Sequence, residues 1–290
     1  MAIDIRRVTV LGTGVLGSQI AFQTAFRGFD VTGYDIDDKA LEAARKRFEK
    51  LAATYAQDVP EAGDGKAAAV AKSITLTADL AEAVADADLV IEAVPEILDL
   101  KRETYKKLGE VAPERTIFAT NSSTLLPSDI VDFTGRPDRF LALHFANLIW
   151  IHNTAEIMGT PATAPEVTKA VVEFASAIGM EPIELHKEKA GYVLNSLLVP
   201  WLNAGLALVA GGYAEPADVD RTWRIGTKSN AGPLQSLDII GLETPYNILA
   251  AGGEKEQQLA AWLKENYIDK GKLGIATGEG FYKYPADGKR

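Results

Sequence analysis

The fold of this chain is decided by residues 8–35, which read VTVLGTGVLGSQIAFQTAFRGFDVTGYD. The apolar run at 8–11 predicts a strand, and the G-x-G-x-x-G sequence after it predicts a tight turn. An apolar stretch with helical character then leads into a second strand, which ends at Asp35. This order of elements is typical of a βαβ unit whose first turn binds the pyrophosphate of a dinucleotide.

Each residue of the glycine turn has a physical task in such a site. Gly12 allows the tight turn out of the strand, and Gly14 lets the backbone approach a pyrophosphate with no Cβ in the way. Gly17 lets the helix pack closely on the strand. Val15 and Leu16 begin the helix, whose unpaired N–H groups attract the anion.

Asp35 indicates which dinucleotide is bound. An acidic side chain at this position hydrogen-bonds the adenosine ribose 2′-OH and repels a 2′-phosphate. Asp37 and Asp38 follow it, and we find no nearby Arg in the sequence that offers itself to a phosphate. The sequence therefore predicts NAD rather than NADP as the cofactor.

Composition limits the class of protein and its partners. The 290 residues are 47% hydrophobic and 24% charged, as in a globular chain of about two domains. The formal net charge of −10 argues against nucleic acid or an anionic membrane as a partner. The absence of cysteine excludes disulfides, thiolate nucleophiles and Cys-based metal sites. With no leader or membrane-spanning run in the sequence, we expect a cytoplasmic protein without a metal centre.

The pattern along the chain predicts two domains of different class. Apolar strands alternate with helices up to residue 188, which predicts a Rossmann-type, doubly wound α/β sheet in domain 1–188, with a helical arm at about 39–72. From residue 189 to the end we find no convincing strand, so 189–290 is predicted to be an all-α domain. Its helices are expected at 193–209, 216–223, 237–250 and 255–267.

A nicotinamide enzyme that oxidises an alcohol needs a base for the hydroxyl proton, and histidine suits that task. Among the three histidines, His144 ends a predicted buried strand, whereas His152 and His186 are expected at the surface. Glu156 follows twelve residues later beside a strand that could pair with the first, where its carboxylate would hold the second imidazole nitrogen. A core histidine with an unrelated Glu is the alternative interpretation.

Six separated motifs then follow one another along the chain. They are Gly12-x-Gly14-x-x-Gly17 with Asp35, Glu92-Ala93-Val94-Pro95-Glu96 with Lys101, Asn121-Ser122-Ser123, His144-Phe145-x-Asn147 with Glu156, Gly191-Tyr192-Val193-Leu194-Asn195, and Gly274-x-x-x-Gly278-Glu279-Gly280-Phe281-Tyr282-Lys283-Tyr284. In this order and spacing the chain resembles the L-3-hydroxyacyl-CoA dehydrogenase family over essentially its whole length. Stretches 120–129 and 144–147 look most like the bacterial diketoreductase and 3-hydroxybutyryl-CoA dehydrogenase-like branch.

The resemblance implies roles for the residues of the substrate site. His144 matches the family's catalytic base, and Glu156 matches the carboxylate that orients it. Ser123 matches the serine that hydrogen-bonds the substrate oxygen. Asn195 matches an asparagine that contacts the substrate from the second domain, and Asn147 matches a further position in the pocket.

The resemblance also implies cofactor contacts and an assembly state. Glu96 and Lys101 match a charged pair near the nicotinamide ribose, with a plain helix-end ion pair as the alternative. Asn121, at the carboxyl end of a predicted strand, is assigned to the cofactor as well. The family's usual state is a homodimer through the second domain, and the long apolar helix at 193–209 is consistent with burial against another subunit.

Three departures from the family pattern bear on the substrate. The active-site His-Phe-x-Asn is usually followed by Pro, where this chain has Leu148-Ile149-Trp150, and Asn195 is followed by Ser196 instead of Arg. The arm at 51–58 has no basic residue where CoA users carry lysines, and it runs into acidic Asp58 and Glu61. Basic residues that could compensate lie earlier in the arm, at Arg45, Lys46, Arg47 and Lys50.

The leading functional hypothesis is an NAD(H)-dependent oxidoreductase that interconverts 3-hydroxyacyl and 3-oxoacyl compounds through a His-Glu dyad. An alternative is a reductase of CoA-free β-dicarbonyl acids or esters with the same dyad. Further alternatives are a gulonate-type dehydrogenase and a non-catalytic, crystallin-like protein. The expected partner is a small molecule in each enzymatic case.

Overall fold

The computed structural model describes residues 3–285, and the chain divides after Val193 into two compact units. The first unit is mixed α/β and the second is helical. The sequence places this change of class slightly earlier, at Lys189. Within the described residues, none of the helices combines the length and the apolar character that crossing a membrane requires.

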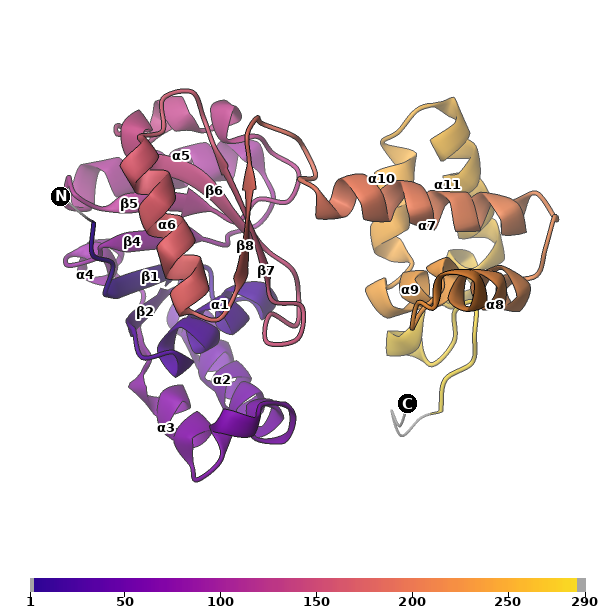
Figure 1. Cartoon of the computed structure of the whole chain (residues 1–290), viewed down its shortest axis with the longest axis horizontal. Helices are drawn as coiled ribbons and strands as arrows, with labels where there is room; N and C mark the ends of the chain where they lie inside the picture. Colours follow the sequence, from indigo (N-terminus) through magenta and orange to yellow (C-terminus); the bar gives the residue numbers. More distant parts are fainter. Residues whose placement is uncertain (1–2, 286–290) are drawn as a thin grey trace. The chain divides into compact units, whose positions relative to one another are not determined.

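The first unit is built on one eight-stranded sheet, as the sequence predicts (Figure 1). Its strand order is β3-β2-β1-β4-β5-β6-β7-β8, and neighbouring strands are parallel except for β6 and β7. The strands are β1 (Arg7–Leu11), β2 (Asp30–Tyr34), β3 (Thr75–Thr77), β4 (Leu89–Glu92), β5 (Ile117–Thr120), β6 (Phe140–Phe145), β7 (Thr154–Gly159) and β8 (Glu181–Leu185). The central strands are fully buried because helices cover both faces.

Two hydrophobic cores separate the helices of this unit into two layers. Its helices are α1 (Val15–Phe26), α2 (Asp38–Asp58), α3 (Lys66–Ser73), α4 (Leu80–Val84), α5 (Leu98–Val111) and α6 (Pro165–Ala177). Residues from α1, α2, α3 and α6 share one core, whereas α4 and α5 contribute to the core on the other face. In Figure 1, α2 and α3 form the predicted helical arm at the lower end of this unit.

The parallel strands bring the polar residues of the sequence motifs to one edge of the sheet. The chain leaves β1 at Gly12, β2 at Asp35 and β5 at Asn121, while Glu92 ends β4 and His144 lies at the end of β6. Carboxyl ends of parallel strands lie at the same sheet edge, which is where open α/β sheets bind their ligands. The strand pairing therefore assembles the candidate site from distant sequence motifs.

The second unit contains α7 (Leu194–Ala210), α8 (Pro216–Thr227), α9 (Pro233–Ile240), α10 (Glu243–Ala250) and α11 (Glu254–Asn266). The prediction of one helix over 237–250 is wrong, because the chain forms two helices there. Gly241 has φ +90°, a conformation that ends α9 and that residues with a Cβ rarely adopt. Pro233 occupies the first turn of α9, where its missing N–H costs nothing.

Two buried carboxylates, of Asp238 and Asp220, anchor the C-terminal motif inside the second unit, and Asp220 accepts a hydrogen bond from the Tyr282 hydroxyl at 2.7 Å. Asp238 accepts hydrogen bonds from the backbone N–H groups of Phe281 and Tyr282 and from the Tyr284 hydroxyl, each at 2.9 Å. A Cβ on Gly280 would overlap the Asp238 carboxylate, which explains the glycine at this position. The motif therefore closes the core of the second unit.

Candidate active site

The glycine turn has the shape that a pyrophosphate requires. Gly12 has φ +85°, and a Cβ on Gly17 would overlap the Gly12 carbonyl oxygen, so neither position accepts a side chain. A Cβ on Gly14 would meet no atom within 4 Å, so the space beside it is open. Gly14 precedes α1 without a side-chain cap, and Val15 is 67% exposed. The N-terminus of α1 thus offers uncapped N–H groups toward open space.

Asp35 is fixed in place by the glycine turn itself. Its Oδ2 accepts hydrogen bonds from the Thr13 N–H at 2.8 Å and the Thr13 hydroxyl at 2.7 Å. The sequence shows no Arg beside Asp35, but the fold brings Arg47 of α2 to the turn, where it donates a hydrogen bond to the Thr13 carbonyl at 3.2 Å. The sequence could not show this contact, since it joins residues that are brought together only by the packing of α2 against the turn.

His144 and Glu156 face each other across the antiparallel pair of β6 and β7. The His144 Nδ1 lies 3.0 Å from Glu156 Oε2, and both side chains are buried. A carboxylate only accepts hydrogen bonds, so this contact places a proton on Nδ1, and in the neutral imidazole Nε2 then has the lone pair. The second oxygen of Glu156 accepts a hydrogen bond from the Val193 N–H at 2.9 Å, which orients the carboxylate.

Ser123 and Tyr192 complete the surroundings of the imidazole. The His144 Nε2 lies 3.1 Å from the Ser123 hydroxyl, so Ser123, His144 and Glu156 form one hydrogen-bonded chain. The Tyr192 ring stacks on the imidazole with centroids 4.5 Å apart and planes 6° from parallel. Its hydroxyl donates to the Ser122 carbonyl at 2.7 Å. These contacts fix the rotation of the imidazole, so that Nε2 faces the Ser123 hydroxyl.

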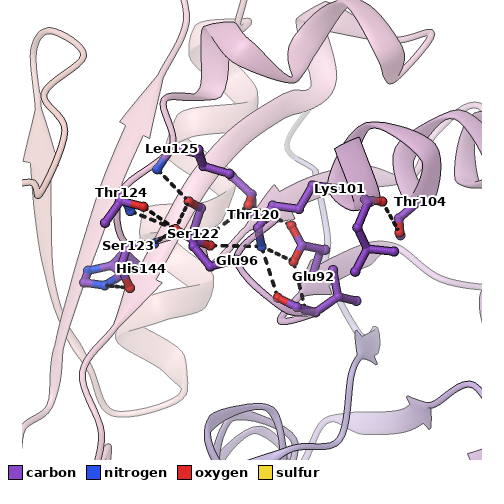
Figure 2. A network of polar contacts seen from close by, with 12 residues as sticks. Glu92, Glu96, Lys101, Thr104, Thr120, Ser122, Ser123, Thr124, Leu125 and His144 are labelled. Carbon is purple, nitrogen blue, oxygen red and sulfur yellow. Dashed lines mark hydrogen bonds and ion pairs between the residues drawn. The ribbon is translucent and has the colours of Figure 1, made fainter. Parts of the chain in front are cut away.

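Glu96 organises the loop that carries Ser123 (Figure 2). Its Oε1 accepts hydrogen bonds from the Ser122 hydroxyl at 2.6 Å, the Ser123 N–H at 3.0 Å, and the N–H and hydroxyl of Thr124, both at 2.9 Å. Burial acts to raise the pKa of Glu96, but the hydrogen bonds from Ser122 and Thr124 and the charge of Lys101 outweigh it and lower the pKa overall. Glu96 is therefore a charged acceptor at the centre of this loop.

Lys101 lies behind Glu96 and is only 1% exposed. Its Nζ is 2.5 Å from Glu92 Oε1 and 3.4 Å from Glu96 Oε2, so the expected Glu96–Lys101 pair has a third member (Figure 2). Burial raises the pKa of Glu92, while Lys101 and the hydrogen bonds to the carboxylate favour its charged form. In the sequence, Glu92 ends an otherwise apolar run, which gives no sign of this ion pair.

The segment after His144 is attached to α1 and to the arm. The Leu148 N–H donates to the Gln19 side-chain oxygen at 2.7 Å. The Trp150 indole N–H donates to Asp58 at 3.0 Å, and the Trp150 ring lies 5.2 Å from that of Tyr55 in α2. The residues that replace the usual Pro therefore fasten the acidic end of α2 to this segment.

The remaining predicted residues have different surroundings. The Asn121 side-chain oxygen accepts a hydrogen bond from the Phe145 N–H at 2.9 Å and so ties the end of β5 to β6. Asn147 is exposed on the segment after His144, and half-buried Asn195 belongs to the first turn of α7 in the second unit. His152 and His186 are exposed, as predicted.

Three residues of the site, Glu92, Tyr192 and Gln19, have weak or no signals in the sequence. Glu92 could have been found, because a carboxylate in a strand buried on both faces requires a partner. Tyr192 was quoted within a motif without a role, since stacking across the fold leaves no spacing signal. Gln19 lies on a helix that is buried from Gly17 to its end, and only the course of the chain after His144 reveals its contact.

Two family models match the chain, one for each unit. Residues 7–189 match the family described as 3-hydroxyacyl-CoA dehydrogenase, NAD binding domain, and residues 191–284 match the 3-hydroxyacyl-CoA dehydrogenase C-terminal domain. The chain belongs to the 3-hydroxyacyl-CoA dehydrogenase family. The two matches together cover nearly all described residues, so the likeness extends well beyond the cofactor turn.

Relatives within the 3-hydroxyacyl-CoA dehydrogenase family match the whole chain. It is 34% identical to the mitochondrial hydroxyacyl-coenzyme A dehydrogenase of Sus scrofa, over 97% of this chain and 91% of that protein. It is 33% identical to a probable 3-hydroxybutyryl-CoA dehydrogenase of Bacillus subtilis, over 97% and 98%. A solved structure, described as a diketoreductase with dual catalysis of dicarbonyl compounds, is 67% identical, with a TM-score of 0.94 and coverage of 97% and 99%.

The residues present fit the cofactor of the 3-hydroxyacyl-CoA dehydrogenase family. The open space beside Gly14 and the uncapped start of α1 suit a pyrophosphate, and the Asp35 carboxylate suits a ribose 2′-OH. NAD is therefore the cofactor of this chain.

Proposed function

We propose that this protein interconverts 3-hydroxyacyl and 3-oxoacyl compounds with NAD(H), using His144 as acid and base. The hydrogen-bonded chain Ser123–His144–Glu156 at the carboxyl ends of the strands carries this proposal. It lies at the same sheet edge as a glycine turn that fits NAD. A base, a hydroxyl and a cofactor turn at one edge are what oxidation of an alcohol requires.

In this proposal Ser123, His144 and Glu156 each have one task. The His144 Nε2 accepts the 3-hydroxyl proton during oxidation and returns it to the 3-oxo oxygen during reduction. Glu156 keeps the proton of the neutral imidazole on Nδ1 and stabilises the imidazolium that forms. The Ser123 hydroxyl donates to the substrate oxygen. Bound NAD(H) supplies the hydride exchange with the substrate's C3 atom.

The proposal includes roles that rest on family resemblance and local placement. Glu96 and Asn121, beside the loop at the end of β5, belong to the cofactor side of the site. The family resemblance assigns Asn147, in the segment after His144, and Asn195, in the first turn of α7, to the substrate. Lys101 helps to hold Glu96 in place on the cofactor side through their ion pair.

A second candidate substrate class, β-dicarbonyl acids or esters without CoA, is favoured by the charge of the arm. The arm ends in exposed Asp58 and Glu61, and Trp150 fastens Asp58 beside the segment after His144. Two basic residues earlier in the arm that could bind the CoA phosphates have other partners. Lys46 pairs with Glu42 at 2.8 Å, and Arg47 donates a hydrogen bond to the glycine turn. An acidic arm end repels the phosphates of CoA. The likeness to a diketoreductase is consistent with this candidate.

Initial rates with two ketones separate the substrate classes. We expect NADH oxidation with both acetoacetyl-CoA and a 3,5-dioxo ester, with kcat/KM for the ester equal to or above that for the thioester. NADPH should support much slower turnover, because Asp35 repels a 2′-phosphate.

A matched variant of the arm tests the electrostatic argument. Asp58→Asn keeps an acceptor for Trp150 and removes the charge, so it should raise kcat/KM for acetoacetyl-CoA about two- to tenfold and leave the ester unchanged. A preference of the unaltered protein for the thioester by several orders of magnitude would refute the CoA-free candidate. Absence of turnover with both ketones would refute the proposed function itself.

The proposal also includes a homodimer formed through the second unit. This unit exposes large apolar side chains on several helices, among them Leu197 at 69%, Ile225 at 74% and Tyr213 in the adjoining loop at 81%. Exposed apolar surface of this kind is typical of an interaction site. Light scattering should give twice the chain mass at micromolar concentration, and a monomer mass would contradict the dimer.

A further inference from the structure

Glu92 is a carboxylate placed where the fold would ordinarily have an apolar residue. It ends β4, the strand between β1 and β5, and it is 0% exposed. Its Oε1 accepts a hydrogen bond from the Val94 N–H at 2.9 Å, and its Oε2 accepts one from the Thr120 hydroxyl at 2.8 Å. Burying a charged group is costly unless it is paired, so such a residue needs a partner of opposite charge.

That partner is Lys101, which is equally enclosed and lies between two carboxylates. Its Nζ contacts Glu92 at 2.5 Å and Glu96 at 3.4 Å, and it also donates to the Val94 carbonyl at 3.3 Å. At 1% exposure the ammonium has little access to water, so these neighbours decide its position. Glu92 thus draws Lys101 to the inner side and keeps it from closing fully on Glu96.

The position of Lys101 matters because Glu96 has two tasks at once. One oxygen faces Lys101, while the other accepts four hydrogen bonds from the loop of Ser122, Ser123 and Thr124. If Lys101 lost Glu92, the attraction of the ammonium would concentrate on Glu96 and compete with these four donors. The loop would then lose its fixed acceptor, and Ser123 would lose its alignment with His144. Figure 2 shows this line of contacts from Glu92 to His144.

We propose that Glu92 is a positioning residue, which acts through Lys101 and Glu96 to hold the Ser123 hydroxyl against His144 Nε2. This inference rests on the proposed function, because it assigns Ser123 and His144 to the reaction. It adds a buried carboxylate, remote from the substrate, to the groups that determine the rate. Thr120 helps to position Glu92, since its hydroxyl donates a hydrogen bond to the second oxygen of the Glu92 carboxylate.

The test is a double-mutant cycle between Glu92 and Ser123. Glu92→Gln keeps the shape of the side chain and removes its charge, and we expect kcat to fall about 10- to 100-fold, because displacements near 1 Å cost about that much. In the Ser123→Ala background the same change should cost almost nothing, since Ser123 is already lost and effects along one line of contacts are not additive.

Glu103→Gln is the matched control, since Glu103 lies on the exposed side of α5 and pairs only with Lys107 in the described contacts. It should leave kcat unchanged. If Glu92→Gln fails to fold, Thr120→Val provides the same cycle without a change of charge, with an expected loss of about threefold to tenfold.

Losses that multiply in the double variant, or a folded Glu92→Gln protein with unchanged kcat, would overturn the positioning role while leaving the proposed function intact. Absence of ketone reduction by the unaltered protein would overturn both.

Discussion

His144→Gln is expected to lower kcat for ketone reduction by about 10³- to 10⁴-fold, near the upper limit of what one general acid–base group contributes. Gln fits the buried space and can hydrogen-bond both Ser123 and Glu156, so the fold is retained. It cannot release or take up a proton near neutral pH. The loss therefore reports proton transfer and not the collapse of the site.

Two measurements make the His144 result decisive. NADH binding, followed by the fluorescence of the nucleotide, should match that of the unaltered protein, because the glycine turn and Asp35 are untouched. His152→Gln, an exposed histidine on the segment between β6 and β7, is the matched control and should keep full activity. A His144→Gln protein with more than about a tenth of normal kcat would refute its role as acid and base.

Glu156→Gln is expected to lower kcat about 10²- to 10³-fold, although it changes one atom only. The Val193 N–H requires an acceptor, so the Gln carbonyl oxygen should stay there and its NH₂ group should point at His144 Nδ1. Nδ1 must then accept, and the imidazole proton moves to Nε2. The residue that should take the hydroxyl proton would hold the wrong tautomer, an error that is costly in His-carboxylate sites.

The Glu156 experiment needs a control for folding, because the residue is 3% exposed. The thermal unfolding midpoint of the variant should stay close to that of the unaltered protein, since His144 and the Val193 N–H keep their hydrogen bonds. Glu184→Gln, an exposed glutamate on the neighbouring strand β8, should behave as the unaltered enzyme. A kcat within about threefold of normal would show that the carboxylate charge and the tautomer it fixes are not needed.

The first unit was largely predictable because its strands are buried on both faces and therefore appear as apolar runs between glycine-rich turns. The same reasoning placed His144 at a strand end and Glu156 on a strand that could pair with it, and the register of β6 and β7 sets them opposite each other. Their catalytic roles stay predictions until the variants are measured.

What could not be predicted depends on contacts between distant segments. Arg47 and Thr13 lie far apart in the sequence, so their hydrogen bond has no local signal. The break between α9 and α10 was missed because the apolar pattern continues across Gly241, whose conformation ends the first helix. The family resemblance pairs Lys101 with Glu96, whereas the shortest contact of Lys101, to Glu92, requires the end of β4 to face α5.

The pairing of β6 with β7 fixes His144 and Glu156 independently of the segment that connects the two strands. The sheet register holds His144 opposite Glu156, so residues 146–153 between the two strands can vary in length and composition without moving either group. Leu148, Ile149 and Trp150 all lie in this stretch, where they depart from the family pattern and contact α1 and the arm. A change of sequence in this one connection can therefore alter the contacts to α1 and the arm while the strand register keeps His144 opposite Glu156.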